Sequence, residues 1–218
     1  MLRLSRWCLF VLLFWLIGWP LLQLLGGAAQ EKGISQSFSQ VFSECLSPTT
    51  LRTAALAFCV ACFSSVVGIS AGWLLAFRPP PFDSLVNFGL IAPLVLPSYV
   101  LGISWTYVMG GWIYSFVGCV FVLTSCWFPL VALLVRRALG DLDREIRASA
   151  MIEGAGTWQL FRLIDLPLVA PVLATGFLLV FIFTLVEFGV PSLLLVKVSS
   201  FEVFVNYSAL YDPSAAAL

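Results

Sequence analysis

Long stretches without a charged residue dominate this sequence. Residues 7–30, 53–77 and 84–135 carry no charge, and a fourth stretch, 166–196, is interrupted only by Glu187. About 20 apolar residues cross the hydrocarbon core of a bilayer as a helix, so the stretch 84–135 is long enough for two crossings. Its break is expected at Gly110-Gly111, where helix propensity is lowest. The pattern therefore predicts an all-α, polytopic membrane helix bundle with five spans.

The two ends of the chain bear on the number of spans. Arg3 and Arg6 precede the first apolar stretch, as in a signal peptide, but this stretch is about twice the usual length of a signal core. We therefore expect a retained first helix. The last residues, 213–218, are Pro-Ser-Ala-Ala-Ala-Leu and are typical of the first turn of a sixth helix. The chain is thus expected to be truncated, or to be the first half of a longer protein.

Composition supports a membrane location and excludes several classes of function. Charged residues make up 10% of the 218 residues and hydrophobic residues 61%, whereas soluble domains carry roughly 25% charged residues. Zero net charge without a basic run makes nucleic-acid binding unlikely. The absence of His excludes Ser-His-Asp and Cys-His catalysis and imidazole-ligated metal sites. No P-loop is present, so we expect no ATP hydrolysis by this chain. We also expect it to hold no metal and no cofactor of its own.

The distribution of Lys and Arg predicts the orientation, because short cytoplasmic loops carry the excess of these residues. A cytoplasmic N-terminus places eight basic residues inside: Arg3, Arg6, Arg78, Arg136, Arg137, Arg144, Arg147 and Arg162. It leaves three outside: Lys32, Arg52 and Lys197. Residues 136–167 are then a large cytoplasmic loop.

This loop has the signals of a helix-turn-helix. Asp141 or Asp143 can cap a helix that runs to about Glu153. Residues 154–156 (Gly-Ala-Gly) end it, and Thr157 caps a second short helix, 158–164, bounded by Pro167. The second helix carries an apolar face made of Trp158, Phe161 and Leu163. A loop that is merely solvated has no need of these side chains, so they indicate a partner surface.

The spacing within the loop resembles that of a known family. The sequence has Ala148-Ser149-Ala150, three residues, Gly154, nine residues and then Ile164-Asp165-Leu166-Pro167. Permease subunits of bacterial binding-protein-dependent ABC importers have Glu-Ala-Ala, three residues, Gly, nine residues and Ile-x-Leu-Pro. Ala148 stands where the family has Glu, so this chain has no carboxylate there to pair with an ATPase.

The resemblance implies a permease of the bacterial inner membrane that does not itself hydrolyse ATP. Its expected partners are a cytoplasmic ATPase dimer that holds ATP and Mg, an extracytoplasmic solute-binding protein, a second permease half or subunit, and the lipid bilayer. Residues 1–218 would form a single permease domain. The residues expected in the ATPase-coupling loop are Ala148, Ser149, Ala150, Gly154, Gly156, Trp158, Phe161, Ile164, Leu166 and Pro167.

Two further segments, 96–101 and 185–191, resemble the iron(III)-type permeases, which have thiamine, phosphonate, sulfate and polyamine relatives. Iron(III) or another small solute is therefore the expected substrate. Proline can break a membrane helix where freed carbonyls line a cavity, as expected at Pro97 and Pro191. Glu187 is either a carboxylate of the translocation path or a residue at the outer interface, with equal weight. The expected path residues are Glu187, Pro97, Ser98, Tyr99 and Pro191.

Two other classes of function remain as alternatives. An ion-coupled secondary transporter usually carries several intramembrane charges, and no coupling loop with this spacing. A membrane enzyme acting on lipid needs paired acids, His or an activated nucleophile near the interface. Glu187 is the only charged residue within an expected span, so the permease interpretation is favoured over both alternatives.

Overall fold

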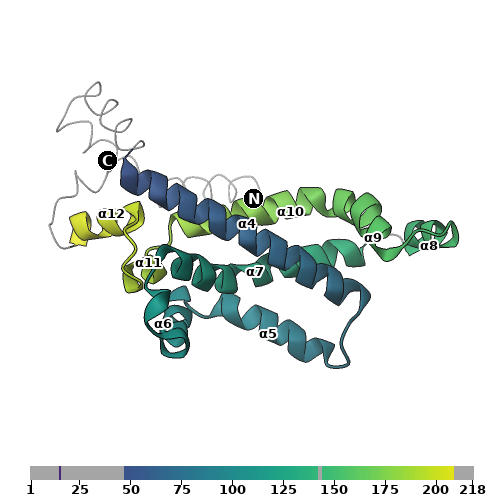
Figure 1. Cartoon of the computed structure of the whole chain (residues 1–218), viewed down its shortest axis with the longest axis horizontal. Helices are drawn as coiled ribbons and strands as arrows, with labels where there is room; N and C mark the ends of the chain where they lie inside the picture. Colours follow the sequence, from purple (N-terminus) through teal and green to yellow (C-terminus); the bar gives the residue numbers. More distant parts are fainter. Residues whose placement is uncertain (1–14, 16–46, 142–143, 209–218) are drawn as a thin grey trace, which may run out of the picture. The chain divides into compact units, whose positions relative to one another are not determined.

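The computed structural model describes residues 15, 47–141 and 144–208. Every regular element in this part of the chain is helical, in agreement with the predicted all-α fold (Figure 1). The predicted first span, 7–30, and the start of a sixth helix, 213–218, lie outside the described residues. The chain divides into two compact units, one made of 52–198 and the other of 1–51 with 199–218.

Three helices in the described residues are long and apolar enough to cross a membrane. They are α4 (Pro48–Phe77), α7 (Phe116–Gly140) and a continuous helix, Thr157–Leu185. The last of these consists of α9 (Thr157–Leu160), a π-helical turn η3 (Phe161–Asp165) and α10 (Leu166–Leu185). The predicted spans 53–77 and the second half of 84–135 therefore correspond to α4 and α7.

The first half of the stretch 84–135 differs from the prediction of one straight span. It forms α5 (Asp83–Val95), α6 (Ser98–Met109) and a 3-10 turn η2 (Gly110–Ile113), with a bend of 105° between α5 and the segment that follows it. The bend lies at Pro97, because the residue before a proline is pushed to extended backbone; Leu96 has ψ 139°. The pair makes a fourth crossing if it counts as one span.

The fifth predicted span is also interrupted. α10 ends at Leu185, and a separate short helix, α11 (Gly189–Leu193), follows. Val186, Glu187 and Phe188 therefore connect two helices rather than continuing one. The two breaks, at 96–97 and 186–188, define the site described below.

Helix α7 is the centre of the larger unit, and glycines allow its neighbours to approach closely. A Cβ atom on Gly68 of α4 would lie 2.5 Å from Cβ of Val131, and one on Gly72 would lie 2.6 Å from the carbonyl oxygen of Ala132. Gly176 of α10 also faces Val131, and a Cβ atom there would lie 3.4 Å from Cγ2 of Val131. Small residues at such interfaces let helix backbones pack closely in lipid, where no hydrophobic driving force exists between helices.

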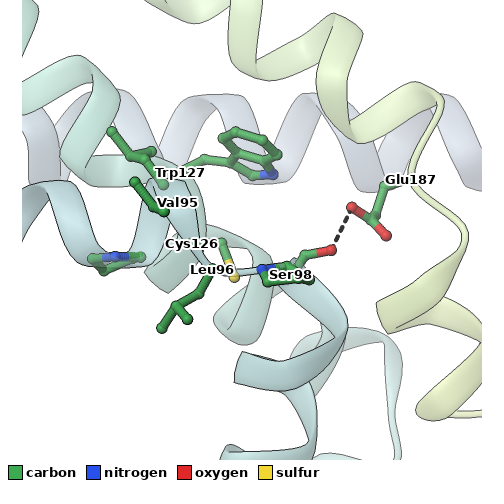
Figure 2. Close-up of a pocket in the computed structure, with 9 residues that line it drawn as sticks. Val95, Leu96, Ser98, Cys126, Trp127 and Glu187 are labelled. Carbon is green, nitrogen blue, oxygen red and sulfur yellow. Dashed lines mark hydrogen bonds between the residues drawn. The ribbon is translucent and has the colours of Figure 1, made fainter.

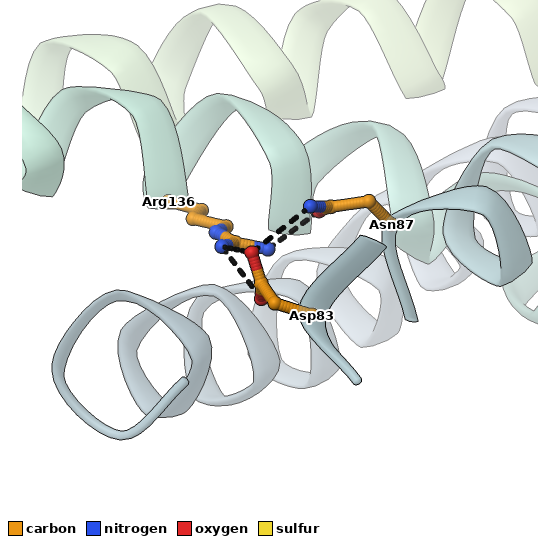
Figure 3. Close-up of polar contacts among 3 residues, drawn as sticks. All are labelled: Asp83, Asn87 and Arg136. Atoms are coloured by element: carbon orange, nitrogen blue, oxygen red, sulfur yellow. Dashed lines mark hydrogen bonds and ion pairs between the residues drawn. The ribbon is translucent and has the colours of Figure 1, made fainter. Parts of the chain in front are cut away.

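A polar cluster fixes α5 to α7 (Figure 3). Arg136, near the end of α7, donates from Nη2 to both carboxylate oxygens of Asp83, at 2.8 and 2.7 Å, and from Nη1 to the side-chain oxygen of Asn87. Asp83 begins α5, so its charge also lies at the favourable end of that helix dipole. The distribution of basic residues predicted a cytoplasmic position for Arg136, but nothing in the sequence paired it with Asp83.

In the other unit, helix α12 (Ser199–Ser208) contacts the first turn of α4. Thr49 donates a hydrogen bond to Oε1 of Glu202 over 3.2 Å, and the hydroxyls of Thr50 and Ser199 lie 3.2 Å apart.

The close α4–α7 contact predicts that a Gly→Ala substitution lowers stability inside the contact but not outside it. Gly72→Ala should lower the free energy of unfolding by about 1–3 kcal/mol, because the added methyl meets the backbone of Ala132. Gly89→Ala on α5 is the matched control: a Cβ there has no neighbour within 4 Å, so stability should stay unchanged or rise by up to about 1 kcal/mol. Unfolding in detergent micelles measures both. Equal stabilities of the two variants would contradict the packing described here.

Candidate functional site

The turn that joins the two helices of the loop is built around Gly154. Helix α8 (Arg144–Ile152) ends there, and Gly154 has φ +90°, a conformation that favours glycine. The N–H of Ala155 donates to the carbonyl of Ala150 over 3.0 Å, and that of Gly154 to Met151 over 3.1 Å. This pair of bonds is the Schellman motif, which closes a helix C-terminus. The prediction that Gly154 ends the first helix is confirmed.

The second helix of the loop differs from its prediction at both ends. Gly156, not Thr157, occupies the N-cap position, and its N–H donates to the side-chain oxygen of Gln159 over 2.9 Å. Pro167 does not end the helix, which runs on to Leu185. The N–H of Leu166 reaches back five residues to Phe161, so a π-helical turn precedes the proline. Proline is also tolerated within the first turn of a helix, and Pro167 is the second residue of α10.

The predicted apolar face of this helix is divided between two environments. Trp158 and Leu163 are 69% and 70% exposed, whereas the ring of Phe161 packs edge-on against Trp73 of α4 at 5.7 Å between centroids. On α8, three apolar side chains that were missed from the sequence, Ile146, Met151 and Ile152, are 50%, 61% and 87% exposed. The exposed large apolar side chains of the two loop helices are therefore Ile146, Met151, Ile152, Trp158 and Leu163.

The remaining residues expected in the loop differ in how far they are exposed to solvent. Ala148, Ser149, Gly154, Gly156 and Pro167 are exposed, while Ala150, Ile164 and Leu166 are exposed only in part, with Asp165 fully buried between the last two. Ser149 donates a side-chain hydrogen bond to the carbonyl of Glu145 within α8. The motif does not specify the residue between Ile and Leu, so sequence reasoning missed Asp165.

The two helix breaks meet at a pocket of about 280 Å³ (Figure 2). It brings together three of the expected path residues, Pro97, Ser98 and Glu187. Tyr99 and Pro191 are not among its lining residues, although Tyr99 lies beside Gly189 and Pro191 is buried in α11. The rest of the lining consists of Pro93, Leu94, Val95, Leu96, Cys126 and Trp127.

The carboxylate of Glu187 connects the first residues of two helices. Its Oε2 accepts a hydrogen bond from the hydroxyl of Ser98, the first residue of α6, over 2.8 Å (Figure 2). Its Oε1 accepts from the N–H of Gly189, the first residue of α11, over 2.9 Å. Helix N-termini favour a negative charge, because their first N–H groups lack partners within the helix.

Two pocket residues, Cys126 and Trp127, were missed from the sequence. They lie in a long apolar run in which no charge or break distinguishes them from lipid-facing positions. Among the described residues, no group of three His, Cys, Asp or Glu side chains is placed to hold a metal ion.

A family model described as "Binding-protein-dependent transport system inner membrane component" matches residues 65–204, which include both the pocket and the loop. The chain belongs to this family. The resemblance read from the loop spacing is thereby confirmed. The matched region covers α5–α11 completely, together with the second half of α4.

Several curated permeases are similar to the chain. ModB, the molybdenum transport system permease protein of Escherichia coli (strain K12), is 34% identical over 142 residues, which are 58% of this chain and 62% of ModB. A probable sulfate transport system permease protein, cysT of Chlorokybus atmophyticus, is 25% identical over 81% of this chain and 66% of its own length. The Fe(3+)-transport system permease protein FbpB 2 of Haemophilus influenzae is 28% identical over 87% of this chain but only 37% of its own length.

A solved structure shares the fold. A chain from the crystal structure of a bacterial alginate ABC transporter, in complex with an alginate pentasaccharide-bound periplasmic protein, matches with a TM-score of 0.65 and 17% identity. The match covers 99% of this chain and 87% of that chain. Against ModB, by contrast, the aligned part of this chain spans about three fifths of the relative's length.

Proposed function

We propose that the chain is a permease component of a bacterial ABC importer in the inner membrane. It provides a translocation path for a small solute and couples that path to ATP hydrolysis by a separate ATPase dimer. The N-terminus and residues 136–167 face the cytoplasm in this proposal. A solute-binding protein outside and a second permease half or subunit complete the transporter.

The observation that carries the proposal is the exposed apolar surface of the loop 136–167 and the helix that continues from it. Its exposed apolar side chains (Ile146, Met151, Ile152, Trp158 and Leu163) favour a protein partner. The helix that bears two of them continues without interruption from Thr157 to Leu185, two residues before the pocket residue Glu187. The twenty residues of α10 alone span about 30 Å. A displacement of the loop by the ATPase can therefore be transmitted along this helix to Glu187.

The pocket supports a substrate without negative charge. Molybdate and sulfate are oxyanions, and each would meet the Glu187 carboxylate at the meeting point of the two helix breaks. Two like unit charges about 4 Å apart repel by about 4 kcal/mol at an effective dielectric constant of 20. A cation is attracted by the same amount. This favours iron(III), or another cationic or neutral solute, over the oxyanions named in two of the relatives.

Uptake measurements in a strain that lacks this gene test the substrate class. Iron(III), molybdate and sulfate are supplied separately as radioactive tracers, with and without the full gene on a plasmid. We expect the gene to restore iron(III) uptake and to leave molybdate and sulfate uptake unchanged. Restored molybdate or sulfate uptake would contradict the role given to Glu187.

A substitution at Gly154 tests the coupling function of the loop. In Gly154→Val the turn residue must keep φ +90°, which costs a β-branched residue about 1–3 kcal/mol. We expect the variant to assemble with its ATPase but to lose most of its uptake while ATP hydrolysis continues. Gly140→Val, at the end of α7, is the control, because φ is not positive there and no atom lies within 4 Å of its Cβ position. Normal uptake by Gly154→Val would remove the basis for this role.

Substitutions at Glu187 test the path. Glu187→Gln and Glu187→Leu should both assemble and both reduce transport of a cationic substrate by about tenfold or more, because each removes the charge. Ser98→Ala is the matched control: it removes one hydrogen bond of the carboxylate and keeps the charge, so most transport should remain. Uptake is measured in reconstituted vesicles at matched expression. Unchanged uptake in both Glu187 variants would indicate an interfacial residue instead.

A further inference from the structure

We propose that Arg147 and Asp165 are positioning residues that fix the loop helix α8 to α4 and α10, so that a displacement of α8 moves two spans together. This inference rests on the proposed function and adds the route by which the loop acts on the membrane helices. Neither residue is among the positions that the loop motif specifies. Arg147 precedes the Ala148-Ser149-Ala150 segment, and Asp165 lies between Ile164 and Leu166.

One oxygen atom of Asp165 joins three helical segments. Asp165 ends η3, directly before α10, and its side chain is fully buried. Its Oδ2 accepts a hydrogen bond from the indole N–H of Trp73 on α4 over 2.8 Å. The same Oδ2 accepts a charge-assisted hydrogen bond from Nη1 of Arg147 on α8. The geometry of this single carboxylate therefore depends on α4, α8 and the start of α10.

Arg147 is held by an aromatic surface as well as by its ion pair. The guanidinium carbon lies 3.6 Å from the centroid of the Phe77 ring, at the end of α4, and the side chain is only 15% exposed. The ring of Trp73 packs edge-on against both Phe77 and Phe161, each with 5.7 Å between centroids. A cation over an aromatic face is attracted most strongly where water is excluded, as it is here.

A buried ion pair is a poor means of stabilising a fold. Two charges must be removed from water, and apolar side chains of similar size often stabilise a protein equally well or better. What the pair provides is a defined relative position, because the buried Oδ2 of Asp165 binds the Arg147 guanidinium and the Trp73 indole at once. We infer that this pair serves the positioning of α8.

The pair complements the turn at Gly154. The Schellman motif closes the C-terminal end of α8, and Ala155 and Gly156 lead directly into α9. By itself, one attachment would leave α8 free to pivot. Arg147 lies nearer the N-terminal end of α8, so the ion pair supplies a second attachment. With two attachments, α8 behaves as a rigid arm of α4 and α10.

The experiment uses the full permease reconstituted with its ATPase and binding protein. Arg147→Gln and Asp165→Asn each remove one charge at nearly constant size, and Arg147→Lys keeps the charge. Arg137→Gln is the matched control, because the Arg137–Asp141 ion pair lies in the same loop region with side chains 82% and 60% exposed. The readouts are ATPase co-purification, basal ATP hydrolysis, its stimulation by the loaded binding protein, and uptake.

Loss of the pair should uncouple the transporter without dismantling it. In Arg147→Gln and Asp165→Asn we expect co-purification and basal hydrolysis to persist, and stimulation and uptake to fall about tenfold. The double variant should be no worse than either single variant, because the two residues act as one unit. Arg147→Lys should retain most of the uptake, and Arg137→Gln should match the unmodified protein.

Two results would overturn the proposal. One is normal uptake in Arg147→Gln and Asp165→Asn; the other is a parallel loss of expression, ATPase binding and uptake, which indicates a role in folding alone. A second measurement avoids these variants: the distance between spin labels at Arg78 and Ser149 should be the same in nucleotide-free and ATP-bound transporter, and a change would refute the rigid arm. Absence of ATP-dependent uptake in the unmodified protein would instead refute the proposed function.

Discussion

The structure depends on how backbone N–H and C=O groups are hydrogen-bonded or surrounded where two apolar helices are interrupted. In a membrane, an N–H or C=O group without a partner costs several kcal/mol, so irregular backbone is tolerated only where protein or a water-filled cavity surrounds it. The interruptions at Pro97 and at residues 186–188 both lie at the same pocket. The carboxylate of Glu187 accepts from the Gly189 N–H in one break and from the Ser98 hydroxyl in the other. The pocket exists because the two breaks face each other.

The opposite end of the larger unit follows a different principle (Figure 1). There the backbone is continuous, since a π-helical turn carries the chain past Pro167 and into α10. The helix Thr157–Leu185 is continuous, whereas α5 and α6, and α10 and α11, are separated by breaks near the pocket. This division of continuous and broken segments suits the proposed coupling, in which force enters at the loop and opens or closes a pocket about one helix length away.

The sequence predicted those features that depend on local chemistry. Charge-free runs located α4, α7 and α10, and the glycine of the loop motif located the turn at Gly154. Pro97 was predicted to break its helix at a cavity, whereas the sequence left Glu187 open between the translocation path and the outer interface. The features that were missed depend on tertiary contacts between distant residues. Nothing near Asp165 indicates that it meets Trp73 or Arg147, and nothing near Pro167 indicates that a π-helical turn would absorb its missing N–H. Cys126 and Trp127 line the pocket only because α7 packs against both breaks.

Thiol labelling of a Ser98→Cys permease tests most directly whether the pocket between the breaks is part of an aqueous path. The native cysteines are replaced, and the assembled transporter in vesicles is treated with a small charged thiol reagent. Leu178→Cys on α10, where the leucine is 57% exposed on a membrane-length helix, serves as the lipid-facing control. The account predicts that Ser98→Cys reacts and that Leu178→Cys does not. Failure of Ser98→Cys to react in both the nucleotide-free and the ATP-bound transporter would contradict it.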